Sequence, residues 1–284
     1  MATNSTPTAR RRRLGAELRK LRERAGITAT QAAVLLGGNQ ARISNIEAGR
    51  YGVSADRVRA LSRHYACTDR GLVEALAAMT GERRSGWWEE YRDELPGSLL
   101  DLAELEHHGT ALRTATTCTL PDLLQTADHA REALNQSAPE LSPPEAEHRL
   151  SFRIRRQDVV FRTEAAPYRA VVHEAALHMG IGGSRVAGPQ LRHLLEMSER
   201  DTVTLRVIPF ASGGHPGAGQ PITYVQGPVA QLDTVHLEQT HGLTQLDAET
   251  LLRTYRQTLD RLESLALDVQ ASRDLLHSLA ATHA

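Results

Sequence analysis

The chain has 284 residues, of which 40% are hydrophobic and 24% are charged, with 21 glycines and 12 prolines. This length is typical of two ordinary domains, and the composition excludes a collagenous or wholly disordered chain. No apolar run approaches the roughly 18 residues that a membrane span needs. The arginine run at residues 10–13 is not followed by the apolar stretch of a secretory signal. We therefore expect a cytoplasmic protein with no membrane partner.

Charge is divided unevenly along the chain. Residues 1–65 contain 13 lysines and arginines against 4 acidic residues, a net charge of +9, whereas residues 66–284 contain 20 against 30, a net charge of −10. An uneven distribution of charge along a chain indicates which kinds of partner each part binds. Here a basic N-terminal part, called the basic head, precedes an acidic remainder, called the acidic body. The two cysteines, Cys67 and Cys118, are too few for a disulfide framework or a four-thiolate zinc site.

The basic head is predicted to be a disordered arm, residues 1–12, followed by an all-α domain of five helices over residues 13–80. Residues 1–9 are rich in Ser, Thr and Ala and show no apolar periodicity. Apolar spacing and helix-stop glycines predict the five helices, which cover approximately residues 14–25, 28–36, 39–48, 55–65 and 69–79.

The second and third of these helices have the spacing of a helix-turn-helix. Thr28 with Gln31 predicts a capping box, and Asn39 after a glycine pair predicts the N-cap of the third helix. Ile43 and Ile46 are predicted to face inward. The opposite face carries Gln, Arg and Asn, whose side chains bridge adenine and guanine edges in a major groove. The alternative interpretation is a helical bundle with solvated polar faces.

The motifs that decide between these interpretations are Leu14-Gly15, Leu18-Arg19, Leu21-Arg22, Gly26-Ile27-Thr28, Ala33, Gly37, Asn39-Gln40, Ile43-Ser44-Asn45-Ile46-Glu47 and Gly49. Together they resemble the lambda-repressor-like, XRE-type helix-turn-helix family. The resemblance implies a recognition helix over residues 39–48. It implies DNA contacts from Thr28, Gln31, Asn39, Gln40, Ala41, Arg42, Ser44, Asn45 and Arg50, with Arg11 and Arg12 of the arm near phosphates.

The acidic body, residues 81–284, is predicted to be an α+β domain. Expected helices cover approximately residues 100–108, 122–134, 144–162, 174–180 and 187–199, and expected strands cover 111–118, 168–173, 202–210, 221–226 and 229–238. The last two strands are predicted to pair as a hairpin across Gly227-Pro228. Residues 244–281 are predicted to form two helices.

The body also carries a second set of motifs, namely Trp87 to Tyr91, Leu120-Pro121-Asp122-Leu123-Leu124-Gln125-Thr126, Arg153-x-Arg155-Arg156-Gln157, His173-Glu174-Ala175-Ala176-Leu177, Gln190-Leu191, Leu194-Leu195, Val207-Ile208-Pro209-Phe210 and Ser272-Arg273. In this order they resemble the uncharacterised domain that follows the helix-turn-helix in the actinobacterial Scr family. That resemblance implies a toxin-antitoxin-like regulator whose large domain senses, dimerises or holds a small partner protein encoded nearby.

Several groups of residues in the acidic body are candidate sites of chemistry. His236, Glu238 and His241 are the only tight His/Glu group, and we expect an edge strand with outward polar residues rather than a metal site. Arginines on the predicted 144–162 helix are interpreted as a solvated or carboxylate-paired face rather than an anion site. The candidates for ligand or partner contact are Trp87, Trp88, Arg153, Arg156, His173 and Glu174.

We predict a sequence-specific DNA-binding transcriptional regulator that binds double-stranded DNA as a homodimer. Its large domain is predicted to dimerise and to sense a small partner protein or a small-molecule ligand. The alternative is an antitoxin-like interaction module for which DNA binding is autoregulation. Because the sequence presents no nucleophile with a base and an oxyanion site, we expect no enzyme, no cofactor and no metal.

Overall fold

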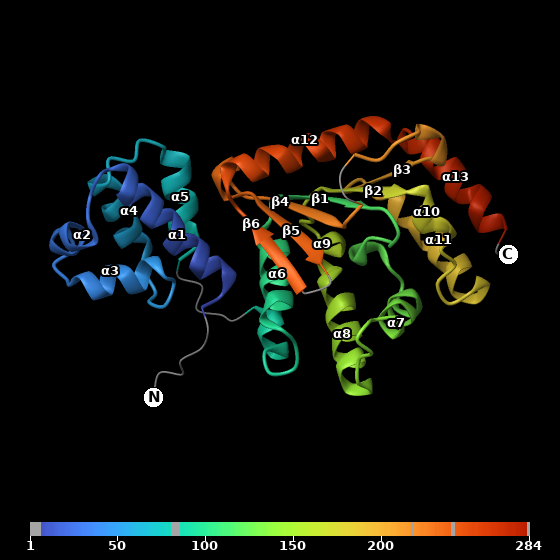
Figure 1. Ribbon diagram of the computed structural model, residues 1–284, viewed down its shortest axis with the longest axis horizontal. Helices are drawn as coiled ribbons and strands as arrows, with labels where there is room; N and C mark the ends of the chain where they lie inside the picture. The colour runs from blue at the N-terminus through green and yellow to red at the C-terminus, as the bar shows by residue number, and fades with distance from the viewer. Residues whose placement is uncertain (1–6, 81–85, 217–218, 240–241, 283–284) are drawn as a thin grey trace. The chain divides into compact units, whose positions relative to one another are not determined.

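The computed structural model describes residues 7–80, 86–216, 219–239 and 242–282. The chain forms two compact units, residues 1–89 and 90–284, and each is described by itself (Figure 1). The first unit is helical and the second combines helices with a six-stranded sheet. The expected fold class, an all-α domain followed by an α+β domain, is confirmed. Among the described helices, none has both the length and the apolar character needed to cross a bilayer.

Within its described residues the first unit contains the five predicted α-helices. They are α1 (Ala9–Arg24), α2 (Ala29–Leu35), α3 (Gln40–Glu47), α4 (Ala55–His64) and α5 (Arg70–Ala78). Each is preceded by a side chain that accepts a hydrogen bond from the backbone N–H three residues later, and these capping residues are Thr8, Thr28, Asn39, Ser54 and Asp69. The caps satisfy donors that helix ends leave unpaired, which explains where these short helices begin.

The first helix begins earlier than the sequence interpretation placed it. Residues 9–12 are helical rather than part of a disordered arm, because the Thr8 hydroxyl accepts a hydrogen bond from the Arg11 N–H at 3.3 Å and caps the helix. Arg10 then donates from Nη2 to the carbonyl of Ala78 at 3.2 Å, which ties the start of α1 to the end of α5. Residues 1–6 of the expected arm lie outside the described residues.

Close contact between α1 and α3 holds the helix-turn-helix in place. A side chain at Gly15 would put its Cβ 2.4 Å from the carbonyl oxygen of Glu47, so only glycine allows the two helices to approach this closely. Arg22 of α1 binds Glu47 through two hydrogen bonds, Nε to Oε1 at 2.6 Å and Nη2 to Oε2 at 2.9 Å. Its Nη1 also donates to the carbonyl of Ile27 at 2.7 Å, at the turn before α2.

The second unit is built on the strands β1 (Ala111–Thr116), β2 (Tyr168–His173), β3 (Val203–Ile208), β4 (Ile222–Gln226), β5 (Thr234–Gln239) and β6 (Gly242–Leu246). Its α-helices are α6 (Gly97–His108), α7 (Ala127–Asn135), α8 (Pro143–Arg156), α9 (Asp158–Phe161), α10 (Glu174–His178), α11 (Ser184–Ser198), α12 (Glu249–Leu265) and α13 (Val269–Ala281). Short 3-10 helices are η1 (Trp87–Tyr91), η2 (Asp122–Leu124), η3 (Phe210–Ser212) and η4 (Ala230–Leu232).

The sheet is mixed, with the strand order β3-β2-β1-β4-β5-β6. Strands β1, β2 and β3 run parallel to one another, whereas β4, β5 and β6 continue from β1 as an antiparallel meander. Leu112 of β1 therefore lies opposite both Tyr168 of β2 and Val225 of β4. The parallel half needs helical crossovers and the antiparallel half does not, so most helices of this unit come before β4 in the chain.

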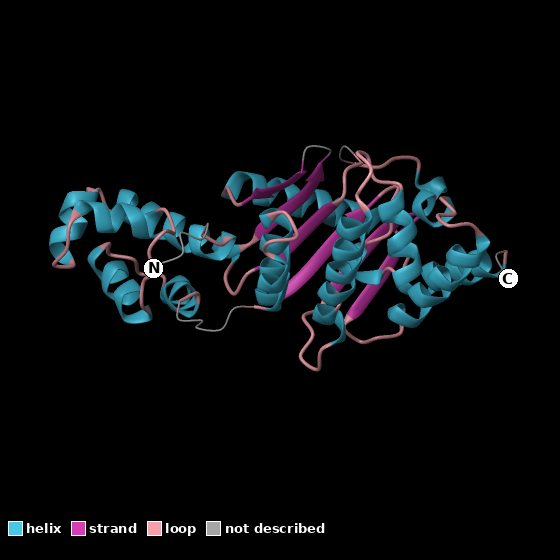
Figure 2. Cartoon of the chain, turned by 90° about the horizontal axis from the view of Figure 1, so that it is seen from below, coloured by secondary structure: helices cyan, strands magenta, loops and turns pink. Residues whose placement is uncertain are grey.

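Two apolar clusters cover the two faces of this sheet. On one face, alternate residues of β1, β2 and β3 pack against η2, α9, α10, α11 and α13, with Tyr168, Val172 and Leu194 among the fully buried side chains. On the other face, Tyr224, Val235 and neighbouring residues pack against Leu259 and Leu262 of α12. Figure 2 shows the helices of the first of these faces in front of the strands.

Three expected elements differ from the sequence prediction. The segment 122–134 is divided into η2 and α7, because the Thr126 hydroxyl accepts from the His129 N–H and starts a new helix. The segment 144–162 is divided at Gln157, whose amide donates to the carbonyl of Gln125 at 2.7 Å. The helix predicted to begin at residue 244 begins only at Glu249, because residues 242–246 pair with β5 and form β6. The predicted pairing of β4 with β5 is confirmed, although β5 begins at Thr234 and not at residue 229.

The Gly15→Ala substitution should destabilise the first unit. The added methyl group cannot fit between α1 and the last turn of α3, and we expect the free energy of unfolding to fall by about 1–2 kcal/mol despite the better helix propensity of alanine. Urea denaturation followed by circular dichroism measures this change. Gly52→Ala is the matched control, because a Cβ there meets nothing within 4 Å. Equal stability of the two variants would contradict the close contact.

Candidate functional site

The third helix of the first unit presents a polar face at its N-terminal end. Gln40, Ala41 and Arg42 are exposed, while Ile43 and Ile46 on the opposite side are buried, as the sequence predicts. Ser44 is also exposed. The exposed face begins at the helix N-terminus, where backbone N–H groups and the helix dipole favour negatively charged ligands such as phosphates.

Intramolecular hydrogen bonds orient several of the predicted DNA-contacting side chains. The side-chain oxygen Oδ1 of Asn39 accepts from the Arg42 N–H at 2.9 Å and caps α3. Arg50 donates to the side-chain oxygen of Asn45 at 3.4 Å. Gln40 accepts a hydrogen bond from the Thr30 hydroxyl at 3.4 Å, so Thr30 lies beside the predicted recognition helix. Sequence reasoning missed Thr30; its position two residues after the N-cap of α2 was the available signal.

The second helix and the start of the first contribute the other predicted contacts. Thr28 and Gln31 form the expected capping box, with the Thr28 N–H donating to Gln31 Oε1 at 2.8 Å. Both side chains are exposed, but their hydrogen-bonding groups are engaged with one another. Arg11 and Arg12 are exposed on the first turns of α1, and Arg12 donates to the carbonyl of Pro7. The backbone of these two arginines also contacts Gly49, which follows α3.

Four of the residues predicted to meet a ligand or partner are not gathered at one place. Trp87 and Trp88 contact each other edge to face, with ring centroids 5.9 Å apart, and Trp88 is buried. His173 caps α10 by accepting from the Ala175 N–H at 3.1 Å, and Glu174 accepts from the Phe210 N–H at 2.7 Å. The bond of Glu174 therefore joins the end of β2 to the segment that follows β3, whereas the bond of His173 is local.

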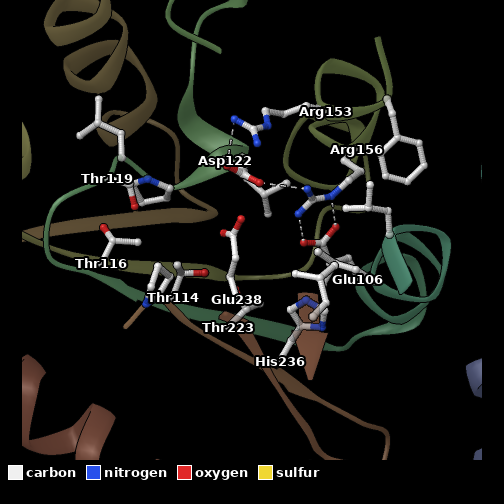
Figure 3. A pocket seen from close by; sticks show the side chains of 18 of the residues that line it. Glu106, Thr114, Thr116, Thr119, Asp122, Arg153, Arg156, Thr223, His236 and Glu238 are labelled. Atoms are coloured by element: carbon white, nitrogen blue, oxygen red, sulfur yellow. Dashed lines mark hydrogen bonds and ion pairs between the residues drawn. The ribbon is translucent and has the colours of Figure 1, made fainter. Parts of the chain in front are cut away.

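The remaining two predicted residues, Arg153 and Arg156, line a pocket of about 100 Å³ on the face of the sheet that α6 and α8 cover. The pocket lies over β1, β4 and β5, and side chains from α6, η2 and α8 form its other wall (Figure 3). Its polar lining residues are Glu106, Thr114, Thr116, Thr119, Asp122, Arg149, Arg153, Arg156, Tyr168, Thr223, His236 and Glu238, and its apolar lining includes Leu99, Leu102, Phe152 and Leu243.

A buried ion pair forms the inner end of this pocket. Arg156 donates from Nε and Nη2 to the two carboxylate oxygens of Glu106, at 2.9 and 2.7 Å, and from Nη1 to Asp122 at 3.1 Å. Burial alone would lower the pKa of Arg156, but the charges of Glu106 and Asp122 raise it further than burial lowers it. Arg153 lies 3.5 Å from Asp122 and donates to Gln125 at 3.0 Å. The expected carboxylate-paired arginine face is confirmed.

The opposite wall of the pocket carries His236 and Glu238, and here the sequence expectation is wrong. Strand β5 lies between β4 and β6, so it is not an edge strand, and His236 is only 3% exposed. The sequence pattern did place both side chains on one face of a strand. Figure 3 shows Glu238 pointing across the pocket toward Asp122. The third member of the expected group, His241, lies outside the described residues.

Two charge effects distinguish the carboxyl groups that face each other in the pocket. Burial acts to raise the pKa of Asp122, but the charges of Arg153 and Arg156 hold it below its ordinary value. Burial and the charge of Asp122 together raise the pKa of Glu238, which lines the pocket although the residue as a whole is exposed to solvent. Within the described ranges, no three histidine, cysteine or acidic side chains converge as metal ligands do.

The neutral state of His236 predicts a dependence of stability on pH. Burial, assisted by the charge of Arg156, lowers the pKa of His236 to about 4, and burial lowers that of His129 to about 4. In the pH range between these values and the ordinary 6.5, the unfolded chain binds more protons than the folded one. This contribution to stability is therefore complete above pH 6.5 and is lost as the pH falls toward 4.

The substitution His236→Asn should flatten this pH dependence. We expect the wild-type free energy of unfolding to fall between pH 6.5 and 4.5, and the variant to lose less, with a difference of up to about 3 kcal/mol. Urea denaturation at several pH values measures both slopes. His277→Asn, at an exposed position on α13, is the control and should keep the wild-type slope. Identical slopes for His236→Asn and the wild type would contradict a buried neutral His236.

Two segments of the chain match known families. Residues 13–76 match a family described as a helix-turn-helix domain, and residues 99–278 match one described as a domain of unknown function, DUF5753. No curated protein and no solved structure matches the chain. The first match contains α1 to α3 with the polar face described above, and the second contains the sheet and the pocket. The chain belongs to the family of the domain of unknown function DUF5753, and a DNA-binding helix-turn-helix domain precedes that domain.

Proposed function

We propose that the protein is a sequence-specific transcriptional regulator of the XRE type that inserts α3 into the major groove of its operator. The observation that carries this proposal is the exposed polar face at the N-terminal end of α3. Ile43 and Ile46 are buried on the opposite side of the helix, so this polar face points away from the core. Gln40, Arg42 and Asn45 supply amide and guanidinium groups of the kind that recognise base edges. The N-terminus of α3 is exposed. Its free backbone N–H groups and partial positive charge attract the phosphates that border a DNA groove.

The remaining predicted contacts are assigned to the DNA backbone. Ser44 and Arg50 flank the base-reading face, and Arg11 and Arg12 are exposed on the neighbouring turn of α1. Contacts of this kind fix the register of a protein on the duplex and make binding dependent on salt, but they do not read sequence. Thr28 and Gln31 cap α2. Their proposed role is to hold the backbone N–H groups at the start of that helix near a phosphate.

The second unit is proposed to dimerise the protein and to sense a small partner protein or a ligand. The pocket supports a ligand-sensing role, because it brings charged and hydroxyl side chains from seven separate elements to one place. The proposal assigns no chemical reaction to this unit. An Scr-like role as an antitoxin-like module that holds a small partner remains the second candidate, and its test is co-purification with the product of the neighbouring gene.

The Arg42→Ala variant separates base reading from phosphate binding. If Arg42 reads a base, we expect a loss of about 1–3 kcal/mol, roughly 5- to 150-fold in affinity, for the native operator and a much smaller loss for a scrambled duplex. Fluorescence anisotropy with the region upstream of the gene, at two salt concentrations, measures both affinities. Arg70→Ala is the control, because Arg70 begins α5 and lies outside the proposed interface. An equal loss on both duplexes would assign Arg42 to phosphate, and no loss would remove it from the interface.

A homodimer predicts a second measurable property. Sedimentation velocity of the full chain should give a species of twice the 31.2 kDa chain mass, and binding to the upstream region should saturate at two chains per operator. A monomer that binds the operator at a ratio of one to one would contradict the proposed dimer. It would leave the assignment of α3 to the major groove intact.

A further inference from the structure

The arginines of the pocket are already engaged with carboxylates. Arg156 donates from all three of its nitrogens, to Glu106 and to Asp122. Arg149 binds Glu145 at 2.8 Å, and Arg153 lies between Asp122 and Gln125. An anionic ligand would therefore have to displace an existing carboxylate partner. Breaking a buried pair of this kind leaves a charge without its partner, which is strongly unfavourable.

The other wall of the pocket carries polar groups without such partners. His236 is only 3% exposed, and neither of its ring nitrogens has a hydrogen-bond partner among the described residues. The hydroxyl of Thr116, a residue 4% exposed, has none there either. Buried polar groups are rarely left unpaired, because each loses its hydrogen bonds to water without replacement. These groups face a cavity of about 100 Å³, which has room for a molecule that supplies the missing partners.

The cavity is lined by three carboxyl groups, those of Glu106, Asp122 and Glu238, and by three guanidinium groups, those of Arg149, Arg153 and Arg156. Arg149 is paired with Glu145, which does not line the cavity. Only Arg153 and Arg156 are therefore left to balance the three carboxyl groups. Glu238 makes no ion pair within the described part of the chain, and it extends toward Asp122 (Figure 3). The position between these two carboxyl groups is therefore short of one positive charge.

We infer that the pocket binds a small organic molecule that carries a protonated amine, with the amine placed between Glu238 and Asp122. The neutral imidazole of His236 and the hydroxyls of Thr116 and Thr223 then meet the polar remainder of the molecule, and Leu102 lines the space for its carbon atoms. An ammonium group also relieves the repulsion between the two carboxyl groups. The raised pKa of Glu238, caused by burial and by the charge of Asp122, agrees with this arrangement.

This inference deepens the ligand-sensing role proposed above and rests on that role for its biological meaning. Binding to the pocket itself is measured without DNA. Binding of the full chain to its upstream region, measured in parallel, tests the proposed regulator separately. Failure of one measurement is therefore distinguishable from failure of the other.

The experiment compares three probes of nearly equal size that differ in charge, namely butylammonium, butyrate and 1-butanol. Each is titrated into the full chain at constant ionic strength, and binding is followed by the thermal midpoint of unfolding and by the imidazole resonances of His236. We expect saturable stabilisation and a shift of the His236 resonances with butylammonium, and neither effect with butyrate at the same concentration. Butanol should act more weakly than butylammonium, because it lacks the charge.

Two variants connect the effect to the proposed site. Glu238→Gln removes the charge that would receive the amine, and we expect butylammonium to bind at least tenfold more weakly. Glu249→Gln makes the same change at an exposed position at the start of α12 and should bind as the wild type does. Preference for butyrate would overturn the inference. Equal effects of the two substitutions, or no saturable binding of butylammonium up to tens of millimolar, would overturn it as well.

Discussion

The buried pairing of Arg156 with Glu106 and Asp122 is the interaction on which the second unit depends. It joins α8 to α6 and to η2 through three hydrogen bonds, and both members of the Arg156–Glu106 pair are almost completely shielded from solvent. Removing either partner would leave an uncompensated charge in the interior, which costs about 3–5 kcal/mol in comparable buried pairs. The ion pair thus fixes the distance between α6 and α8, and these helices form the wall of the pocket opposite the sheet.

An ion pair between Arg22 and Glu47 also joins two helices in the first unit, and there it orients an exposed face instead of forming a pocket wall. Arg22 and Glu47 join α1 to the last turn of α3, and the hydrogen bond from Arg22 to the carbonyl of Ile27 adds the turn before α2. Hydrogen bonding to Glu47 raises the pKa of Arg22, so the charged form of this guanidinium group is favoured. The ion pair, together with the close approach at Gly15, sets the angle at which the polar face of α3 is presented.

The two units use polar residues in opposite ways. In the first unit the predicted DNA-contacting residues lie on the outside of short helices, where hydrogen bonds to neighbours orient them and solvent still reaches them. In the second unit the polar residues of the pocket come from segments as distant as Glu106 and Glu238, and they gather between the sheet and the helices α6 and α8. A large polyanion needs the first arrangement, whereas a small molecule needs the second.

The sequence by itself determined the local features of both units. The caps at Thr28 and Asn39, the inward Ile43 and Ile46 and the strand Tyr168–His173 follow from spacing along the chain, because helix and strand periodicity act over only a few residues. Only the tertiary structure decided that β6 forms, that β5 lies inside the sheet and that Glu106 meets Arg156. Those outcomes depend on which separate segments pair with one another in the folded chain, and no periodicity within one segment records that choice.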